Sequence, residues 1–318
     1  MIGALRKTGR SAVRLAVRSG IRKAKAYAES VLIPRSNEDL AISAALAESH
    51  VISELNYPAS YVDFLRQCIQ RQHHVVKHLK SEAGSGEAAK RFATLLDVLR
   101  TDVPAVPLAI AHDIGRVADG FRSMAETKAF ADWIGDVGLH FAISSSFGRK
   151  GRLLSTIIRY MRAERCLEVG TAYGMSALFM LSVLAAKGRS GHLTTVEGGR
   201  DQFELASTML KERYGENVSC RFGSSSDELR SLADTPQAID FFFHDAGHSR
   251  EMYLKDFGAA LPMLAPGSTI LIDDIYWDDP RFYKTPPRAH DGWLEIVGHS
   301  RVLQAVEVDH AVGLALLA

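Results

Sequence analysis

The chain has 318 residues, of which 47% are hydrophobic and 24% are charged, and its formal net charge is +1. This length and composition suit a soluble globular protein with a large core, and the near balance of charge excludes a global attraction to nucleic acid or to a strongly acidic partner. The three cysteines, Cys68, Cys166 and Cys220, form no Cys-x-x-Cys pair, which argues against a disulfide framework and a thiolate zinc site. We therefore expect a cytoplasmic protein whose binding specificity is local.

Residues 1–28 are basic and contain no acidic residue. Arginines recur about every four residues beside an apolar stripe of Val13, Val17 and Ile21, a pattern typical of a basic amphipathic helix. The segment suits an organellar presequence, a membrane-surface helix or a helix docked on a partner, and a solvated helical terminus explains it as well. The basic residues are Arg6, Lys7, Arg10, Arg14, Arg18, Arg22, Lys23 and Lys25.

The rest of the first half has helical periodicity. It predicts helices at residues 38–55, 59–80, 87–100 and 105–133, separated by "SEAGSGE" and by the prolines at positions 104 and 107. We expect residues 1–140 to form a helical accessory region, whose helices offer a surface for a homo-oligomer.

From residue 153 onward, short apolar runs alternate with helix-length segments, which is typical of βα units. The runs are residues 166–169, 193–196, 218–222, 239–243 and 269–272, and the helical segments are 175–186, 200–214, 226–233 and 251–264. The last stretch, "RVLQAVEVDHAVGLALLA", predicts an antiparallel hairpin. We expect residues 141–318 to form an α/β domain with a doubly wound, mostly parallel sheet of seven strands.

In such a sheet, ligands bind beyond the carboxyl ends of the strands. The first predicted strand ends in "LEVGTAYGMSAL", where Gly170 and Gly174 permit a tight turn and a close approach of the backbone to a ligand. The spacing is not the GxGxxG of a dinucleotide site, and Glu168 would repel a pyrophosphate, so a cationic ligand with an amino group fits better. The same glycines explain why we expect no transmembrane helix in the uncharged run 169–186.

The next two strand ends also carry polar residues. The second strand ends in Glu197, at the place where an acid accepts hydrogen bonds from ribose hydroxyls. The third ends in "FGSSSDEL", whose Gly223, Ser224 and Ser225 are placed to meet an adenine ring. Each signal is weak alone, because glycine turns after strands are common in ordinary packing.

The stretch "FFFHDAGHSREMY", residues 241–253, holds two histidines four positions apart. A zinc site of the HExxH type requires a helix, but the β-favouring run before His244 and the Ala246–Gly247 pair disfavour one. As the end of a strand, the segment places Asp245 at the rim of the sheet and His248 in the following loop. His244 then points to the opposite face as a packed or capping residue.

The following strand ends in "ILIDDIYW", so Asp273 and Asp274 can converge with Asp245. Three unpaired carboxylates raise one another's pKa, whereas a divalent cation satisfies them all, and oxygen ligands favour Mg²⁺, Ca²⁺ or Mn²⁺ over zinc. The alternative is that these aspartates cap the helices that follow the strands.

Taken together, "LEVGTAYGMSAL", "HDAGHSREMY" and "ILIDDIYW" resemble the class I S-adenosylmethionine-dependent methyltransferases. Within that class they are similar to the metal-dependent O-methyltransferases, which include catechol, caffeoyl-CoA and macrolide-sugar enzymes, over roughly residues 145–318. The resemblance implies S-adenosylmethionine and Mg²⁺ as cofactors, with Asp245, Asp273 and Asp274 as metal ligands. The implied cofactor-binding residues are Glu168, Gly170, Thr171, Ala172, Tyr173, Gly174 and Ser176 at the methionine end, Glu197 at the ribose, Gly223, Ser224 and Ser225 near the adenine, and Asp245 at the rim.

The resemblance also implies a mechanism. Catechol-type members carry a lysine as base three residues after the first acid; here that position is His248, as in the sugar-modifying members. A histidine suits removal of a hydroxyl proton at neutral pH, with Asp245 beside it at the catalytic centre. We expect methylation of a hydroxyl on a catechol, a vicinal diol or a sugar, with the loop at 276–293 as a wall for the substrate.

Three other functions stay open. An NAD-dependent oxidoreductase is disfavoured by the glycine pattern and the terminal hairpin, whereas a metal-independent methyltransferase and a non-catalytic S-adenosylmethionine-binding protein both fit the same cofactor motif.

Overall fold

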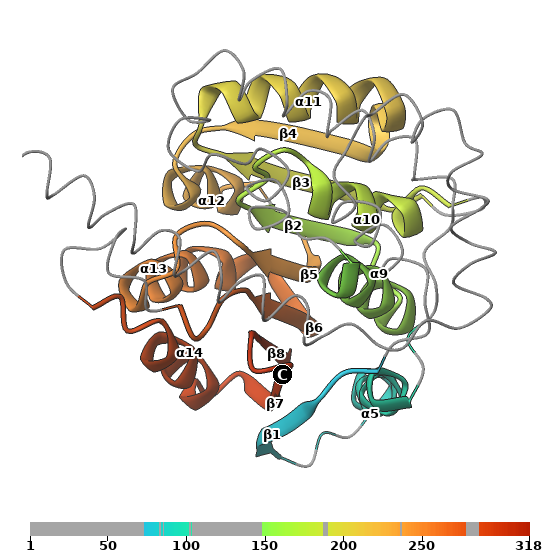
Figure 1. Ribbon diagram of the computed structural model, residues 1–318, viewed down its shortest axis with the longest axis vertical. Coiled ribbons are helices and arrows are strands. Elements are labelled where there is room, and N and C mark those ends of the chain that lie inside the picture. Colours follow the sequence, from blue (N-terminus) through green and yellow to red (C-terminus); the bar gives the residue numbers. More distant parts are fainter. Residues whose placement is uncertain are drawn as a thin grey trace, which may run out of the picture.

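The computed structural model describes residues 73–82, 84, 86–101, 103, 148–186, 190–235, 237–277 and 286–318. These residues form an α/β fold in which one eight-stranded sheet carries helices on both faces (Figure 1). The strands are β1 (Val76–Ser81), β2 (Arg165–Val169), β3 (His192–Glu197), β4 (Val218–Phe222), β5 (Ile239–His244), β6 (Leu264–Ile272), β7 (Val302–Val308) and β8 (Val312–Leu317). The helices are α5 (Glu87–Thr101), α9 (Gly148–Met161), α10 (Met175–Leu184), α11 (Arg200–Tyr214), α12 (Ser225–Ala233), α13 (Arg250–Ala260) and α14 (Ala289–Gly298), with short 3₁₀ turns η2 (Gly215–Asn217) and η3 (Leu261–Met263).

The strand order across the sheet is β1-β7-β8-β6-β5-β2-β3-β4. β2 pairs in parallel with β3 and with β5, and those strands pair in parallel with β4 and β6. β8 is antiparallel to β6, and β7 is antiparallel to β8. The doubly wound, mostly parallel sheet with a C-terminal hairpin is therefore confirmed, and the carboxyl ends of β2 to β6 meet at one edge.

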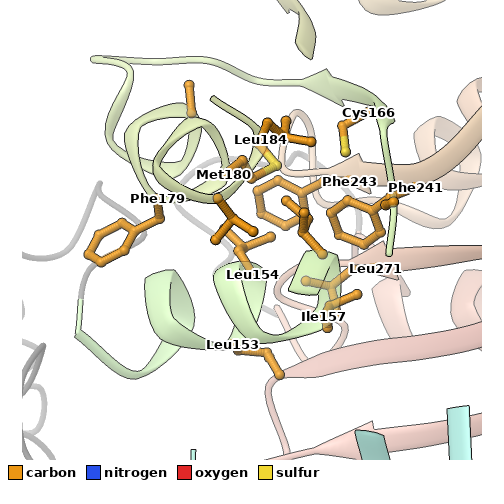
Figure 2. Packing of buried hydrophobic residues seen from close by; sticks show 14 of the residues in the cluster. Leu153, Leu154, Ile157, Cys166, Phe179, Met180, Leu184, Phe241, Phe243 and Leu271 are labelled. Carbon is orange, nitrogen blue, oxygen red and sulfur yellow. The ribbon is translucent and has the colours of Figure 1, made fainter. Parts of the chain in front are cut away.

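The central strands are apolar on both faces because helices cover both. Phe241 and Phe243 of β5 belong to the core that includes Leu154 of α9 and Phe179 of α10 (Figure 2). Phe242 belongs to the core on the other face, with Tyr253 of α13. Successive residues of β5 thus point to opposite faces of the sheet. The same alternation decides to which face each side chain at the carboxyl end of β5 points.

The sheet has eight strands rather than the seven predicted, because residues 76–81 form β1 and do not belong to the predicted helix at 59–80. β1 pairs in antiparallel fashion with β7. Across this pair the Lys77 Nζ lies 3.0 Å from Glu307 Oε2, and the Val75 amide donates to Asp309 Oδ1 at 2.9 Å. These long-range partners are invisible to local periodicity, and they decide the conformation of the segment.

The predicted helix at 87–100 is confirmed as α5, which buries Phe92, Leu95 and Leu99 in the same core as α9. Elements of the first half therefore pack on the sheet, while the predicted boundary between 140 and 141 stays a prediction. The basic segment 1–28 and the predicted helices 38–55 and 105–133 lie outside the described residues. None of the helices in the described ranges is both long enough and apolar enough to cross a membrane.

Candidate active site

A pocket of about 640 Å³ opens at the carboxyl edge of the sheet, among the ends of β2, β3, β4 and β5. Several of the predicted cofactor residues line it, namely Gly170, Ala172, Glu197, Gly223, Ser224, Ser225 and Asp245. The other predicted residues, Glu168, Thr171, Tyr173, Gly174 and Ser176, do not line this pocket and belong to the end of β2, the turn after it and the start of α10.

The turn after β2 depends on its glycines. Gly170 has a φ of 91°, and a Cβ atom there would lie 2.0 Å from the carbonyl oxygen of Asp245. Gly174, with a φ of 83°, is the residue before α10. Both backbones lie in the left-handed region that favours glycine. The turn therefore packs directly against the loop after β5, and the two together form one wall of the pocket.

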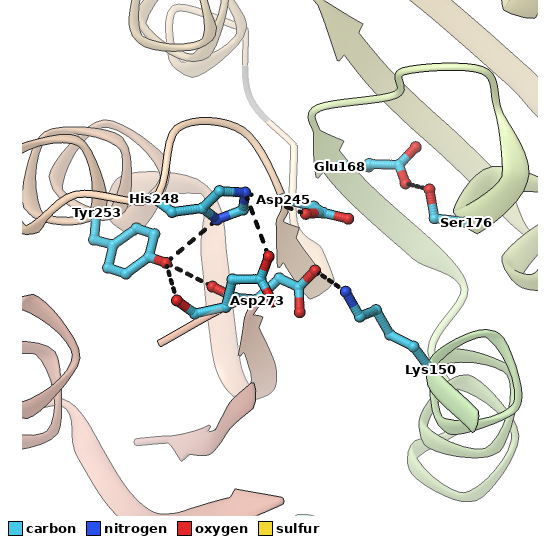
Figure 3. A network of polar contacts seen from close by, with 8 residues as sticks. Lys150, Glu168, Ser176, Asp245, His248, Tyr253 and Asp273 are labelled. Carbon is cyan, nitrogen blue, oxygen red and sulfur yellow. Dashed lines mark hydrogen bonds and ion pairs between the residues drawn. The ribbon is translucent and has the colours of Figure 1, made fainter. Parts of the chain in front are cut away.

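Glu168 supports this turn from within. Its side chain is buried and accepts a hydrogen bond from the Ser176 hydroxyl (Figure 3). It also accepts from the Thr195 hydroxyl at 2.5 Å. Burial raises the pKa of Glu168 to about 7, although both hydroxyls favour its charged form. Glu168 is thus an internal acid that fixes the start of α10.

Glu197 lines the pocket and ties two loops together. Its Oε2 accepts from the Ala172 amide at 2.7 Å, and its Oε1 accepts from the Gly199 amide at 2.6 Å. A carboxylate offers about four acceptor positions, so the hydroxyls of a ligand still find free lone pairs. After the neighbouring strand β4, Ser224 caps α12 through the Asp227 amide.

At the ends of β5 and β6, the side chains of Asp245, Asp273 and Asp274 gather around His248; we call these three carboxylates the acidic cluster (Figure 3). His248 Nε2 lies 3.9 Å from Asp245 Oδ1 and 3.7 Å from Asp274 Oδ2. Asp273 is fully buried. Because Asp245 also lines the pocket, the acidic cluster and the pocket are continuous.

Lys150, which no pattern in the sequence singles out, also reaches the acidic cluster. It stands in the first turn of α9, and its Nζ donates to Asp273 Oδ2 from the side opposite to His248 (Figure 3). The two residues are 123 positions apart in the chain, so neither motif nor spacing indicates the contact.

The charges of this site follow from burial and proximity. Burial, together with the Asp245 carboxylate, raises the pKa of Asp273 to about 7. Burial alone would lower the pKa of Lys150, but the acidic cluster outweighs it and raises that pKa above its usual value. Burial lowers the pKa of His248 despite the nearby carboxylates. At neutral pH the site therefore holds a charged lysine and a neutral histidine.

Two aromatic residues support the histidine. The Tyr253 hydroxyl donates to the carbonyl oxygen of Asp273 at 2.6 Å and lies 3.5 Å from His248 Nδ1. The indole ring of Trp277 lies 5.5 Å from the imidazole, measured between ring centroids. Tyr253 ends the stretch quoted from the sequence, but its role could not be predicted, because its contacts depend on how α13 packs against the sheet.

His244 has a different environment. It is the last residue of β5, fully buried, and its Nε2 lies 3.0 Å from Asp256 Oδ2. Asp256 also accepts from the hydroxyls of Ser225 and Ser226. The prediction of a packed residue is confirmed, and the HExxH alternative is wrong, because the two histidines belong to a strand and a loop and have different partners.

The predicted metal is not confirmed. Asp273 Oδ1 is buried without a hydrogen-bond partner, which would suit a ligand, but its other oxygen is held by Lys150. Within the part of the chain that the structure describes, no group of three or more His, Cys, Asp or Glu side chains is arranged to hold a metal ion. The acidic cluster with Lys150 in place therefore does not fit a divalent cation.

Comparisons with known proteins match part of the chain to methyltransferases. Residues 167–275 match the family model described as "Methyltransferase domain". The chain is 27% identical over 133 residues to caffeoyl-CoA O-methyltransferase 2 of Zea mays, covering 41% of this chain and 48% of that protein. It is 29% identical over 132 residues to a catechol O-methyltransferase of Niastella koreensis, covering 41% and 57%. The chain thus spans about half the length of these curated relatives.

The solved structures that the chain resembles include other O-methyltransferases. The O-methyltransferase TomG from Streptomyces achromogenes, involved in tomaymycin synthesis and solved in complex with S-adenosylmethionine, has a TM-score of 0.49 at 22% identity, over 64% of this chain and 89% of that one. An O-methyltransferase from Bacillus cereus, solved with S-adenosylhomocysteine, has a TM-score of 0.45 at 20% identity, over 53% and 80%. Residues 167–275 are thus similar to a methyltransferase domain, and the curated relatives that overlap them are named O-methyltransferases.

Proposed function

We propose that the protein is an S-adenosylmethionine-dependent O-methyltransferase that acts on a hydroxyl group of a small molecule. The observation that carries this proposal is the position of Asp245, which lines the pocket and lies 3.9 Å from His248. One residue thus joins a cavity suited to the cofactor with a neutral imidazole suited to take a proton.

The pocket residues fit S-adenosylmethionine. Glu197 would hold the ribose hydroxyls, Ser224 and Ser225 would flank the adenine, and the turn at Gly170 would admit the methionine part close to the backbone. The turn at Gly170 lies close to the loop after β5, because a side chain at Gly170 would meet the Asp245 carbonyl oxygen. When bound, the cofactor supplies an electrophilic methyl group on its sulfonium.

His248 is the proposed general base. Since burial lowers its pKa, the imidazole is neutral at pH 7 and can act as the base toward a substrate hydroxyl. With the cofactor bound, the substrate oxygen would take its methyl group as the sulfur–methyl bond breaks, and His248 would keep the proton. Asp245 and Asp274, each within 4 Å of Nε2, stabilise the resulting imidazolium.

The substrate is proposed only as a class. Catechols, vicinal diols and sugars are the compounds suggested by the resemblance, and they form the first panel to assay. A homo-oligomer formed through the N-terminal region stays a prediction, whereas the acidic cluster with Lys150 in place does not support the predicted role of Mg²⁺.

The test is a pair of measurements on the full-length protein. Titration calorimetry should give binding of S-adenosylmethionine and no binding of NAD⁺, and the hydroxyl panel should yield a methylated product. Binding of NAD⁺ alone would contradict the proposal. Binding of S-adenosylmethionine without turnover across the panel would instead support a non-catalytic binding protein.

A further inference from the structure

The geometry points to Lys150 as a built-in cation of the acidic cluster. We propose that its ammonium group takes the place of the divalent metal, so that methyl transfer at this site requires no metal ion. The inference rests on the proposed function, because it concerns how the same site handles its substrate oxygen.

The first argument is position. Lys150 donates to Asp273, whose side chain is fully buried, while 27% of the lysine side chain is exposed. α9 is anchored in the core by Leu153, Leu154 and Ile157 on its next turns (Figure 2). The backbone of Lys150 thus belongs to a helix packed on the sheet, and its ammonium group is positioned by the hydrogen bond to Asp273.

The second argument is competition for the same oxygen. Mg²⁺ requires carboxylate oxygens at about 2.0–2.1 Å in near-octahedral geometry. Asp273 Oδ2 already accepts a hydrogen bond from Lys150. An ammonium at hydrogen-bonding distance blocks that lone pair and repels a second cation, so a metal enters only if the lysine leaves.

The third argument is that His248 and Lys150 together supply the base and the positive charge that the reaction requires. His248 removes the hydroxyl proton, and the Lys150 ammonium, which lies beside Asp273, stabilises the negative charge that develops on the substrate oxygen. A metal of this kind chelates two neighbouring oxygens, whereas an ammonium donates to one. The proposed substrate class therefore includes isolated phenols and alcohols as well as vicinal diols.

The decisive experiment measures Mn²⁺ binding to the metal-stripped full-length protein by electron paramagnetic resonance, which requires no turnover. We expect the wild type and Lys150→Arg to bind weakly, and Lys150→Met to bind at least about tenfold more tightly. Asp273→Asn added to Lys150→Met should remove the gain, which places the ion at the acidic cluster. Lys211→Met, at an exposed position of α11, is the matched control and should behave like the wild type.

A second arm uses activity. Turnover of the wild type should be the same in excess chelator and in Mg²⁺, and Lys150→Met should lose at least about tenfold, with partial recovery in Mn²⁺. If Lys150→Met does not fold, Lys150→Gln serves in both arms, because it also removes the charge.

Equal Mn²⁺ affinity in the wild type and in Lys150→Met, whether tight or weak, would overturn the inference, and so would loss of wild-type turnover in chelator. Failure of S-adenosylmethionine to bind would instead overturn the proposed function, and the Mn²⁺ titrations would still decide the role of Lys150.

Discussion

The two histidines at the end of β5 differ in what they contact, and this difference predicts different mutant behaviour. His248 borders the pocket through Asp245, so His248→Ala should lower saturated turnover by roughly 10² to 10⁴ with nearly constant cofactor affinity. His244 holds Asp256 in the core, so His244→Ala should lower the melting temperature while the folded fraction keeps its turnover. Melting curves and turnover of both variants test the pair, and the opposite pattern would remove His248 as the base.

Glu168 gives a prediction about pH. Its pKa is raised to about 7 in the folded protein, because burial disfavours the carboxylate, against about 4.5 when unfolded. Between these two pH values the folded state binds a proton that the unfolded state does not. The contribution of Glu168 to the free energy of unfolding is therefore full below about pH 4.5 and is lost as pH rises through about 7. We expect Glu168→Gln, which stays neutral, to gain stability relative to the wild type between pH 5 and pH 8. Urea unfolding at both pH values measures the difference, and a constant difference would show that Glu168 is ionised throughout.

At the scale of elements, the turn between β2 and α10 is the tightest constraint in the site. From the sequence, a bulky residue at Gly170 is expected to block the ligand without unfolding the protein. The structure adds that even a methyl group there would collide with the backbone of Asp245 and would need a left-handed φ. Gly170→Ala is therefore expected to cost roughly 1–3 kcal/mol of stability as well as cofactor affinity.

The control for this prediction is Gly258→Ala. Gly258 lies within α13, and a methyl group added there would meet no atom of the described residues within 4 Å, so alanine should stabilise the helix by about 0.5–1 kcal/mol. Chemical denaturation of both variants, with calorimetry of cofactor binding, separates the two glycines. Unchanged stability of Gly170→Ala would mean that the turn moves away from β5 at little cost.

The elements that sequence predicted well are those whose pattern is local. The apolar runs that became β2, β5 and β6 are buried on both faces, and a short apolar run bounded by turn residues indicates such a strand. The convergence of the acidic residues after β5 and β6 could also be predicted, because the carboxyl ends of parallel strands lie at the same edge of a sheet. Lys150 and Tyr253 could not be found this way, because their contacts depend on how α9 and α13 pack against the sheet.

At the scale of the whole molecule, the first half was the least predictable part. Residues 76–81 have the charge pattern of an exposed helix, yet they form a strand because β7 supplies a pairing partner, with Glu307 facing Lys77. Just before β1, the Val75 amide donates to Asp309 in the turn after β7. A contact between segments more than 200 positions apart leaves no trace in a local window.

The position of β1 has a consequence for solubility. β1 covers β7, so the outer strand of the C-terminal hairpin is not left as an open edge. Open edges pair readily with other chains, and β7 would expose an apolar strand that carries Val302, Val306 and Val308. A fragment of residues 141–318, although it contains every predicted site residue, should therefore aggregate, whereas one of residues 73–318 should not. Light scattering at matched concentration compares the two, and equal scattering would show that β1 does not protect this edge.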